Sequence, residues 1–88
     1  DMAVGRKKDS FLAGNFATKE AFVKALGTGF RGVELKDLAV LRDELGKPFI
    51  KICNNLNRHL QGIDENKIHV SISNTDSLAI AMVVIETD

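Results

Sequence analysis

The stretch that decides the fold is Phe16-Ala17-Thr18-Lys19-Glu20-Ala21-Phe22-Val23-Lys24-Ala25-Leu26-Gly27-Thr28-Gly29. Its apolar residues recur at the spacing of an amphipathic helix. Upstream, Asp9 and Ser10 can each cap a first turn, so we predict one helix over residues 9–26. Gly27 stands where a left-handed residue ends a helix. Gly14 costs the helix about 1 kcal/mol relative to alanine, which predicts that another segment approaches closely there.

Glu20 and Lys24 lie four residues apart, on one side of this predicted helix. A surface ion pair worth about 0.3–0.5 kcal/mol explains the spacing. So does a carboxylate that holds Mg²⁺ beside a lysine that contacts phosphate. The segment Gly27-Thr28-Gly29 is either an ordinary turn after the helix or a loop whose N–H groups cradle phosphate oxygens. Spacing alone leaves these alternatives open.

The composition excludes several classes of protein. The 88 residues suffice for one domain, and 12 basic residues balance 12 acidic ones, which argues against a general binder of nucleic acids or membrane surfaces. The chain has one cysteine, Cys53, so it can form neither an internal disulfide nor a cysteine zinc site, and we predict a cytoplasmic location. No apolar run is long enough to span a bilayer.

Two hairpins follow the helix in the predicted order of elements. The first joins a strand over residues 33–41 to a strand over 48–52, through a turn in which Gly46 supplies a positive φ. Pro48 is tolerated as the first residue of its strand. The second joins residues 67–73, which alternate apolar and polar, to residues 78–85, which are nearly all apolar.

The alternating strand is predicted to be half-buried, and residues 78–85 to be buried on both faces. Between the hairpins, Ile52, Leu56 and Leu60 are spaced by four, which predicts a short helix over residues 53–61 that ends at Gly62. The fold class is therefore α+β: a long helix and a short helix with an antiparallel sheet built from two hairpins.

The remaining polar residues carry weak signals. His59, His69 and Cys53 have no partner at metal-ligand or nucleophile spacing, so we interpret them as structural or solvated. Ser73-Asn74-Thr75 at a strand end can recognise a ligand or form a turn.

Four motifs in order carry a resemblance. They are Phe11-Leu12-Ala13-Gly14-Asn15-Phe16-Ala17-Thr18-Lys19-Glu20-Ala21, then Lys24-Ala25-Leu26-Gly27-Thr28-Gly29, then Asp43-Glu44-Leu45-Gly46-Lys47-Pro48, and His69-Val70-Ser71-Ile72-Ser73-Asn74-Thr75. From about residue 6 to the end, the chain closely resembles the bacterial holo-[acyl-carrier-protein] synthases of the 4'-phosphopantetheinyl transferase superfamily.

The resemblance implies the 4'-phosphopantetheinyl transferase fold and a magnesium-dependent reaction. The family transfers 4'-phosphopantetheine from coenzyme A to a serine of acyl carrier protein, for fatty acid biosynthesis in the cytoplasm. Glu20 falls on the family's metal-binding glutamate, and Lys24 on the lysine that meets the coenzyme A phosphates. Gly27, Thr28 and Gly29 would lie along the nucleotide.

The resemblance further implies a homotrimer with active sites between subunits. Gly46-Lys47-Pro48 and Ser73-Asn74-Thr75 resemble the adenine and ribose-phosphate surfaces, which a neighbouring subunit supplies in the family. Two residues depart from the pattern. Many members have arginine, which can touch the 3'-phosphate, where Asn15 stands, and histidine where Asn74 stands.

A third departure concerns the start of the chain. The family begins with a strand that carries a Gly-x-Asp motif, whose aspartate is the other metal ligand, and with a basic helix that docks the carrier protein. Neither lies within residues 1–88. We therefore expect a single domain that corresponds to the C-terminal two-thirds of a family member. The alternatives are a non-catalytic module for coenzyme A binding or trimerisation, and a structural domain without a ligand.

Overall fold

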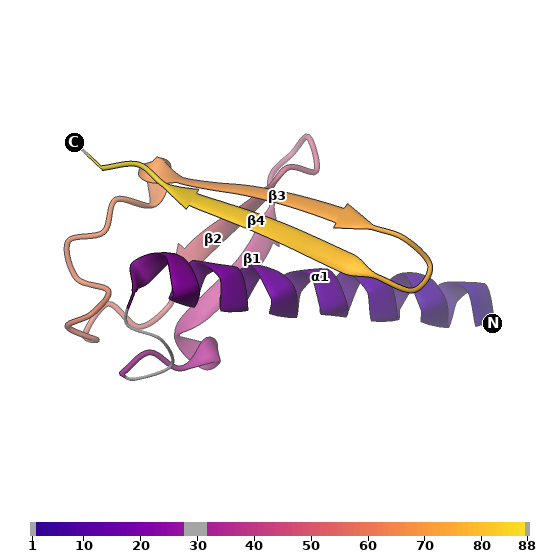
Figure 1. The fold of residues 1–88 in the computed structure, drawn as a ribbon, viewed down its shortest axis with the longest axis horizontal. Helices are drawn as coiled ribbons and strands as arrows, with labels where there is room; N and C mark the ends of the chain where they lie inside the picture. Colours follow the sequence, from indigo (N-terminus) through magenta and orange to yellow (C-terminus); the bar gives the residue numbers. More distant parts are fainter. Residues whose placement is uncertain (1, 28–31, 88) are drawn as a thin grey trace.

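The computed structural model describes residues 2–27 and 32–87, in which one long helix precedes two antiparallel hairpins (Figure 1). In chain order they are α1 (Met2–Leu26), a 3₁₀ helix (Leu35–Asp37), β1 (Leu38–Arg42), β2 (Pro48–Ile52), a second 3₁₀ helix (Glu65–Lys67), β3 (Ile68–Asn74) and β4 (Ala79–Ile85). β1 pairs with β2, and β3 with β4, both antiparallel. The predicted α+β class is confirmed.

Helix α1 is longer than predicted, because it already runs from Met2. Asp9 and Ser10 therefore lie inside the helix, and the prediction that one of them caps it is wrong. Residues 2–8 include Met, Ala, Arg and two Lys, all good helix formers, so the helix continues through both polar residues. Its predicted end is confirmed: Gly27 has φ of 77° and donates its N–H to the Lys24 carbonyl at 3.0 Å.

The core lies between α1 and the strands. Phe22 and Val23 of the helix are fully buried. The other buried apolar residues of the core are Val33, Leu38, Val40, Ile50, Leu60, Ile68 and Val70. The close approach predicted at Gly14 is also confirmed. A Cβ at this position would lie 3.0 Å from Ile72 Cγ2 and 3.3 Å from Asn74 Oδ1. Glycine at position 14 therefore lets the end of β3 pack directly on the helix.

The first hairpin is shorter than predicted, since β1 begins at Leu38. The Asp37 carboxylate accepts the N–H of Glu34 at 3.0 Å, which folds residues 34–37 into a capped turn instead of a strand. Arg42 lies opposite Pro48 in the register, and Pro48 begins its strand as expected. Gly46 has the predicted positive φ, 83°.

The prediction of a short helix over residues 53–61 is wrong, because this segment consists of turns. Asn54 Oδ1 accepts the N–H of Leu56, and Asn57 Oδ1 accepts that of His59. Such side-chain bonds compete with helical backbone bonds. Leu56 is 84% exposed, so the four-residue spacing does not mark a buried helical face.

In the second hairpin, the predicted alternation of β3 is confirmed, with Ile68 and Val70 buried and His69 exposed. The prediction that β4 is buried on both faces is wrong for this chain. Helix α1 packs against one face of β4 only. On the other face Ile80, Met82 and Val84 remain 59%, 65% and 51% exposed.

Candidate functional site

The outward side of α1 carries the two charged residues that the sequence singled out. Glu20 is half-buried and Lys24 is exposed in the last turn of the helix. No ion pair joins these two described side chains, so the surface ion pair is not observed. A lysine in the last turn is favoured by the helix dipole. The helix therefore carries a half-buried carboxylate and an exposed ammonium group one turn apart.

The glycine loop after α1 is described only at its two ends. Gly27 N–H bonds to the Lys24 carbonyl, so this amide serves the helix end and not a phosphate cradle. Thr28 and Gly29 lie outside the described residues. Farther on, Asn57 Nδ2 donates to the Gly32 carbonyl, and the His59 ring packs against Gly32.

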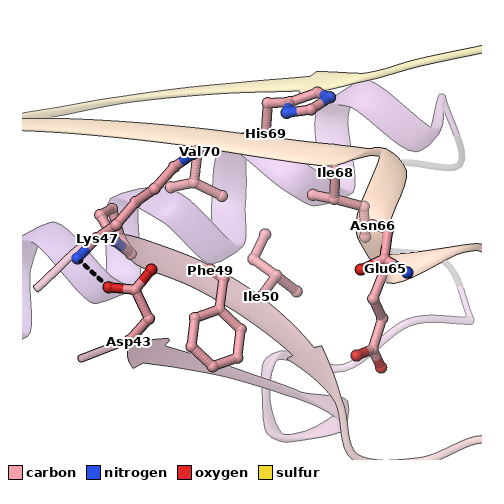
Figure 2. Close-up of a pocket in the computed structure, with 10 residues that line it drawn as sticks. Asp43, Lys47, Phe49, Ile50, Glu65, Asn66, Ile68, His69 and Val70 are labelled. Carbon is pink, nitrogen blue, oxygen red and sulfur yellow. Dashed lines mark hydrogen bonds between the residues drawn. The ribbon is translucent and has the colours of Figure 1, made fainter. Parts of the chain in front are cut away.

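The tip of the first hairpin carries Gly46, Lys47 and Pro48. Asp43 Oδ1 accepts the N–H groups of Leu45 and Lys47, each at 2.9 Å, which fixes the turn. Beside it lies a pocket of about 370 Å³ between β2 and β3. Figure 2 shows its apolar floor, and its lining comprises Asp43, Lys47, Pro48, Phe49, Ile50, Glu65, Asn66, Ile68, His69 and Val70. Lys47 and Pro48 thus belong to a concave surface.

The third predicted segment ends β3. Ser73 and Asn74 are exposed, and Asn74 lies beside Gly14 of α1. Thr75 Oγ1 accepts the N–H of Leu78 at 3.0 Å, and the Thr75 N–H bonds to the Leu78 carbonyl at 2.7 Å. Thr75 therefore helps to form the turn between β3 and β4, which is one of the two roles predicted for this segment.

Within residues 2–27 and 32–87, the pocket beside Lys47 and Pro48 includes neither Glu20 nor Asn74. Along α1, Glu20 and Lys24 lie about 9 and 15 Å from Gly14, where Asn74 packs, at about 1.5 Å per residue. The hairpin tip and the β3–β4 turn lie at different edges of the molecule (Figure 1). One chain thus offers separate surfaces: the α1 side, the hairpin tip and the end of β3.

Asp37 centres a polar cluster that the sequence did not reveal. It is 5% exposed and accepts bonds from Glu34 N, from Asn54 Nδ2 at 3.2 Å and from Asn57 Nδ2 at 3.0 Å. The backbone bond from Glu34, then the amides of Asn54 and Asn57, hold the pKa of the Asp37 carboxyl below its ordinary value. These bonds tie the turns after β2 to the segment before β1, which is a structural role.

In the described part of the chain, no three His, Cys, Asp or Glu side chains gather as a metal centre. Mg²⁺ needs only one or two protein carboxylates, because phosphate oxygens and water complete its octahedron. The half-buried carboxylate of Glu20 fits that requirement. Across residues 2–27 and 32–87, no helix has the length and hydropathy to cross a membrane.

Comparison with known proteins shows to which superfamily the chain is similar. The 4'-phosphopantetheinyl transferase superfamily model matches residues 3–83. The holo-[acyl-carrier-protein] synthase of Clostridium beijerinckii is 51% identical over 79 residues, which are 90% of this chain and 63% of that protein. The enzyme of Halothermothrix orenii is also 51% identical, over 83% of this chain and 58% of its own length. The chain thus spans less than two thirds of these relatives.

A solved structure agrees with the fold. The Helicobacter pylori holo-[acyl-carrier-protein] synthase, crystallised in complex with coenzyme A, superposes with a TM-score of 0.71 at 29% identity. The superposition covers 97% of this chain and 72% of that one. With the family match over nearly the whole chain and relatives at half identity, the chain belongs to the 4'-phosphopantetheinyl transferase superfamily.

Proposed function

We propose that the protein transfers 4'-phosphopantetheine from coenzyme A to a serine of an acyl carrier protein. The observation that carries the proposal is the family match over residues 3–83, with relatives named for this activity at 51% identity. In the reaction the serine oxygen bonds to the β-phosphorus, the bond to the leaving nucleotide breaks, and adenosine 3',5'-bisphosphate departs. The converted carrier protein would serve fatty acid biosynthesis in the cytoplasm.

Glu20 and Lys24 are the residues we propose for the chemistry. Glu20 would hold Mg²⁺, which when bound supplies positive charge next to the pyrophosphate. Lys24 is exposed on the same side of α1 and would contact the pyrophosphate, where it stabilises negative charge as the leaving nucleotide forms. Gly27, Thr28 and Gly29 would border the nucleotide at the end of the helix.

We propose a homotrimer in which each site lies between two copies. Gly46, Lys47 and Pro48 at the hairpin tip, with Ser73, Asn74 and Thr75 at the end of β3, would supply the nucleotide surface of the neighbouring copy. Two observations support this arrangement. Among the described residues, the pocket beside Lys47 and Pro48 does not include Glu20, and one face of β4 exposes three apolar side chains. Exposed apolar faces of this kind mark protein contacts.

The alternative is a module that binds coenzyme A or trimerises without catalysis. The two proposals differ in one result. With coenzyme A, Mg²⁺ and apo carrier protein, the full-length enzyme adds one phosphopantetheine group to the carrier protein, which mass spectrometry detects, and Glu20→Ala abolishes the addition. Stabilisation by coenzyme A without any mass change would favour the binding module.

A further inference from the structure

Gly32 is held by two residues of the turns that follow β2. Asn57 Nδ2 donates to the Gly32 carbonyl, across 25 positions of sequence. The His59 ring lies so close that a Cβ at position 32 would be 2.4 Å from His59 Nε2. Gly32 also has φ of 83°, a conformation that other residues rarely adopt. Glycine is therefore required at this position, and residues 57–59 determine where it lies.

Stability alone does not require the bond from Asn57. Gly32 is exposed, so its carbonyl can accept a hydrogen bond from water instead. Exchange of a water for a side-chain amide changes the free energy of unfolding only modestly. The main effect of the bond is therefore to fix the position of Gly32.

The Asn57 amide is itself firmly anchored. It has two N–H donors, and its Nδ2 makes two bonds, one to the Gly32 carbonyl and one to Asp37 Oδ2 at 3.0 Å. Its Oδ1 accepts the N–H of His59 at 2.9 Å. Asp37 is 5% exposed and directly precedes β1. Through Asn57, Gly32 is thus connected to the core of the protein.

Asn54 makes nearly the same bonds as Asn57. It lies in the same turns and is also half-buried. Its Nδ2 donates to Asp37 Oδ1 at 3.2 Å, and its Oδ1 accepts the N–H of Leu56 at 3.2 Å. Each asparagine thus bonds to Asp37 and closes its own turn. Among the described residues, the two side chains differ in one bond, which is the bond from Asn57 to Gly32.

Gly32 lies five residues after Gly27, the first residue that the proposed function assigns to the nucleotide. Gly27 is fixed at the end of α1 by its bond to the Lys24 carbonyl. We infer, on the basis of the proposed function, that Asn57 is a positioning residue for coenzyme A. By holding Gly32 it fixes a second point of the chain next to the proposed nucleotide surface, and it does so without contact to coenzyme A.

The expected effect of losing the bond is on coenzyme A binding. Without Asn57, the chain after Gly27 adopts more conformations in the free enzyme, and only a fraction of them binds coenzyme A. The apparent dissociation constant rises by the inverse of that fraction. Since one hydrogen bond is lost, KM for coenzyme A should rise about 2- to 10-fold. The value of kcat should stay near that of the parent, because the bound state is unchanged.

The test compares Asn57→Ala with the matched control Asn54→Ala in the full-length enzyme, by steady-state transfer to apo carrier protein. Both variants lose one bond to Asp37 and one turn bond, so their melting temperatures should fall by similar amounts. Asn57→Ala should raise KM for coenzyme A about 2- to 10-fold and leave kcat and KM for the carrier protein within about twofold. Asn54→Ala should change none of these three values by more than about twofold.

Asn57→Ser serves if Asn57→Ala does not fold. The serine oxygen can still accept the N–H of His59, but the amide donors are gone, so the same rise of KM for coenzyme A is expected. A merely structural role gives another result. The folded fraction of the enzyme falls, which lowers the apparent kcat and leaves KM for coenzyme A at its parental value.

That result, or an equal rise of KM for coenzyme A in Asn54→Ala and Asn57→Ala, would overturn the inference. The proposed function fails in a different way: the unsubstituted enzyme would then transfer no phosphopantetheine group, and the inference would fall with it.

Discussion

Replacing Met82 with lysine should dissociate the proposed trimer. Met82 lies at the centre of the outward face of β4, between Ile80 and Val84, and is 65% exposed in the single chain. Because the side chain already faces solvent, a lysine here should change the stability of the isolated fold by no more than about 0.5 kcal/mol. Any large effect must come from the contact that covers this face.

The size of that effect follows from the exposure. Full burial of a Met, Ile or Val side chain is worth about 1.5–3 kcal/mol, and Met82 is still 65% exposed. A partner would therefore gain about 1–2 kcal/mol from Met82. A lysine forfeits this gain and adds several kcal/mol for the desolvation of its ammonium group. A total near 4 kcal/mol weakens association about a thousandfold.

Sedimentation equilibrium over a range of protein concentrations measures this change directly. We expect the unsubstituted protein to sediment as a trimer and Met82→Lys as a monomer at the same concentration. Leu56→Lys is the matched control, since Leu56 is 84% exposed in the turns after β2 and should leave the assembly unchanged. A Met82→Lys variant that still sediments as a trimer, or a parent that is monomeric, would refute the reasoning.

Three further predictions concern the site and the stability of the fold. Lys24→Ala should lower kcat/KM for coenzyme A about 10- to 100-fold with an unchanged melting temperature, because Lys24 is exposed; steady-state kinetics showing parental values would remove it from the site. The pKa of the Asp37 carboxyl is lower in the folded protein than its ordinary value of 3.8, because the ionised group accepts hydrogen bonds. These bonds therefore stabilise the fold fully above about pH 3.8, and the stabilisation is lost as the pH falls through the folded pKa. Urea midpoints should therefore drop below about pH 4, and a drop as steep in Asp37→Asn would contradict that origin. Gly14→Ala gains about 1 kcal/mol of helix propensity but must displace Ile72 or Asn74, so urea unfolding should differ by less than about 1 kcal/mol while KM for coenzyme A rises several-fold. An unaltered KM would show that the position of Asn74 does not matter for the nucleotide.

Local pattern predicted much of the fold. The helix, the glycine at position 27 and the turn at Gly46 depend on neighbouring residues, and the structure bears them out. The apolar stripe of α1 holds only in part: Val23 is buried, but Leu12 and Phe16 are 54% and 53% exposed. The helix predicted over residues 53–61 failed for a long-range reason. Asn54 and Asn57 bond to Asp37, which lies 17 and 20 positions away, and no spacing within the segment reveals that partner.

The burial of β4 also could not be predicted from its own residues. Its nearly continuous apolar residues predicted cover on both faces, but within one chain α1 covers one face only. An apolar sequence does not say whether its cover comes from the same chain or from another. The open face of β4 is what a contact between copies would require.

The candidate site was only partly accessible from the sequence. The spacing of Glu20 and Lys24 fits an ordinary ion pair as well, and it was the order of four motifs that assigned them chemistry. The Asn57–Gly32 bond joins residues 25 positions apart, so no short motif contains it.

The most direct test of the central claim is the mass of apo carrier protein after incubation with the full-length enzyme, coenzyme A and Mg²⁺. The account predicts an increase equal to one phosphopantetheine group on the carrier serine, with release of adenosine 3',5'-bisphosphate, and no increase with Glu20→Ala. An unchanged carrier mass with the parent enzyme, or an undiminished increase with Glu20→Ala, would contradict it.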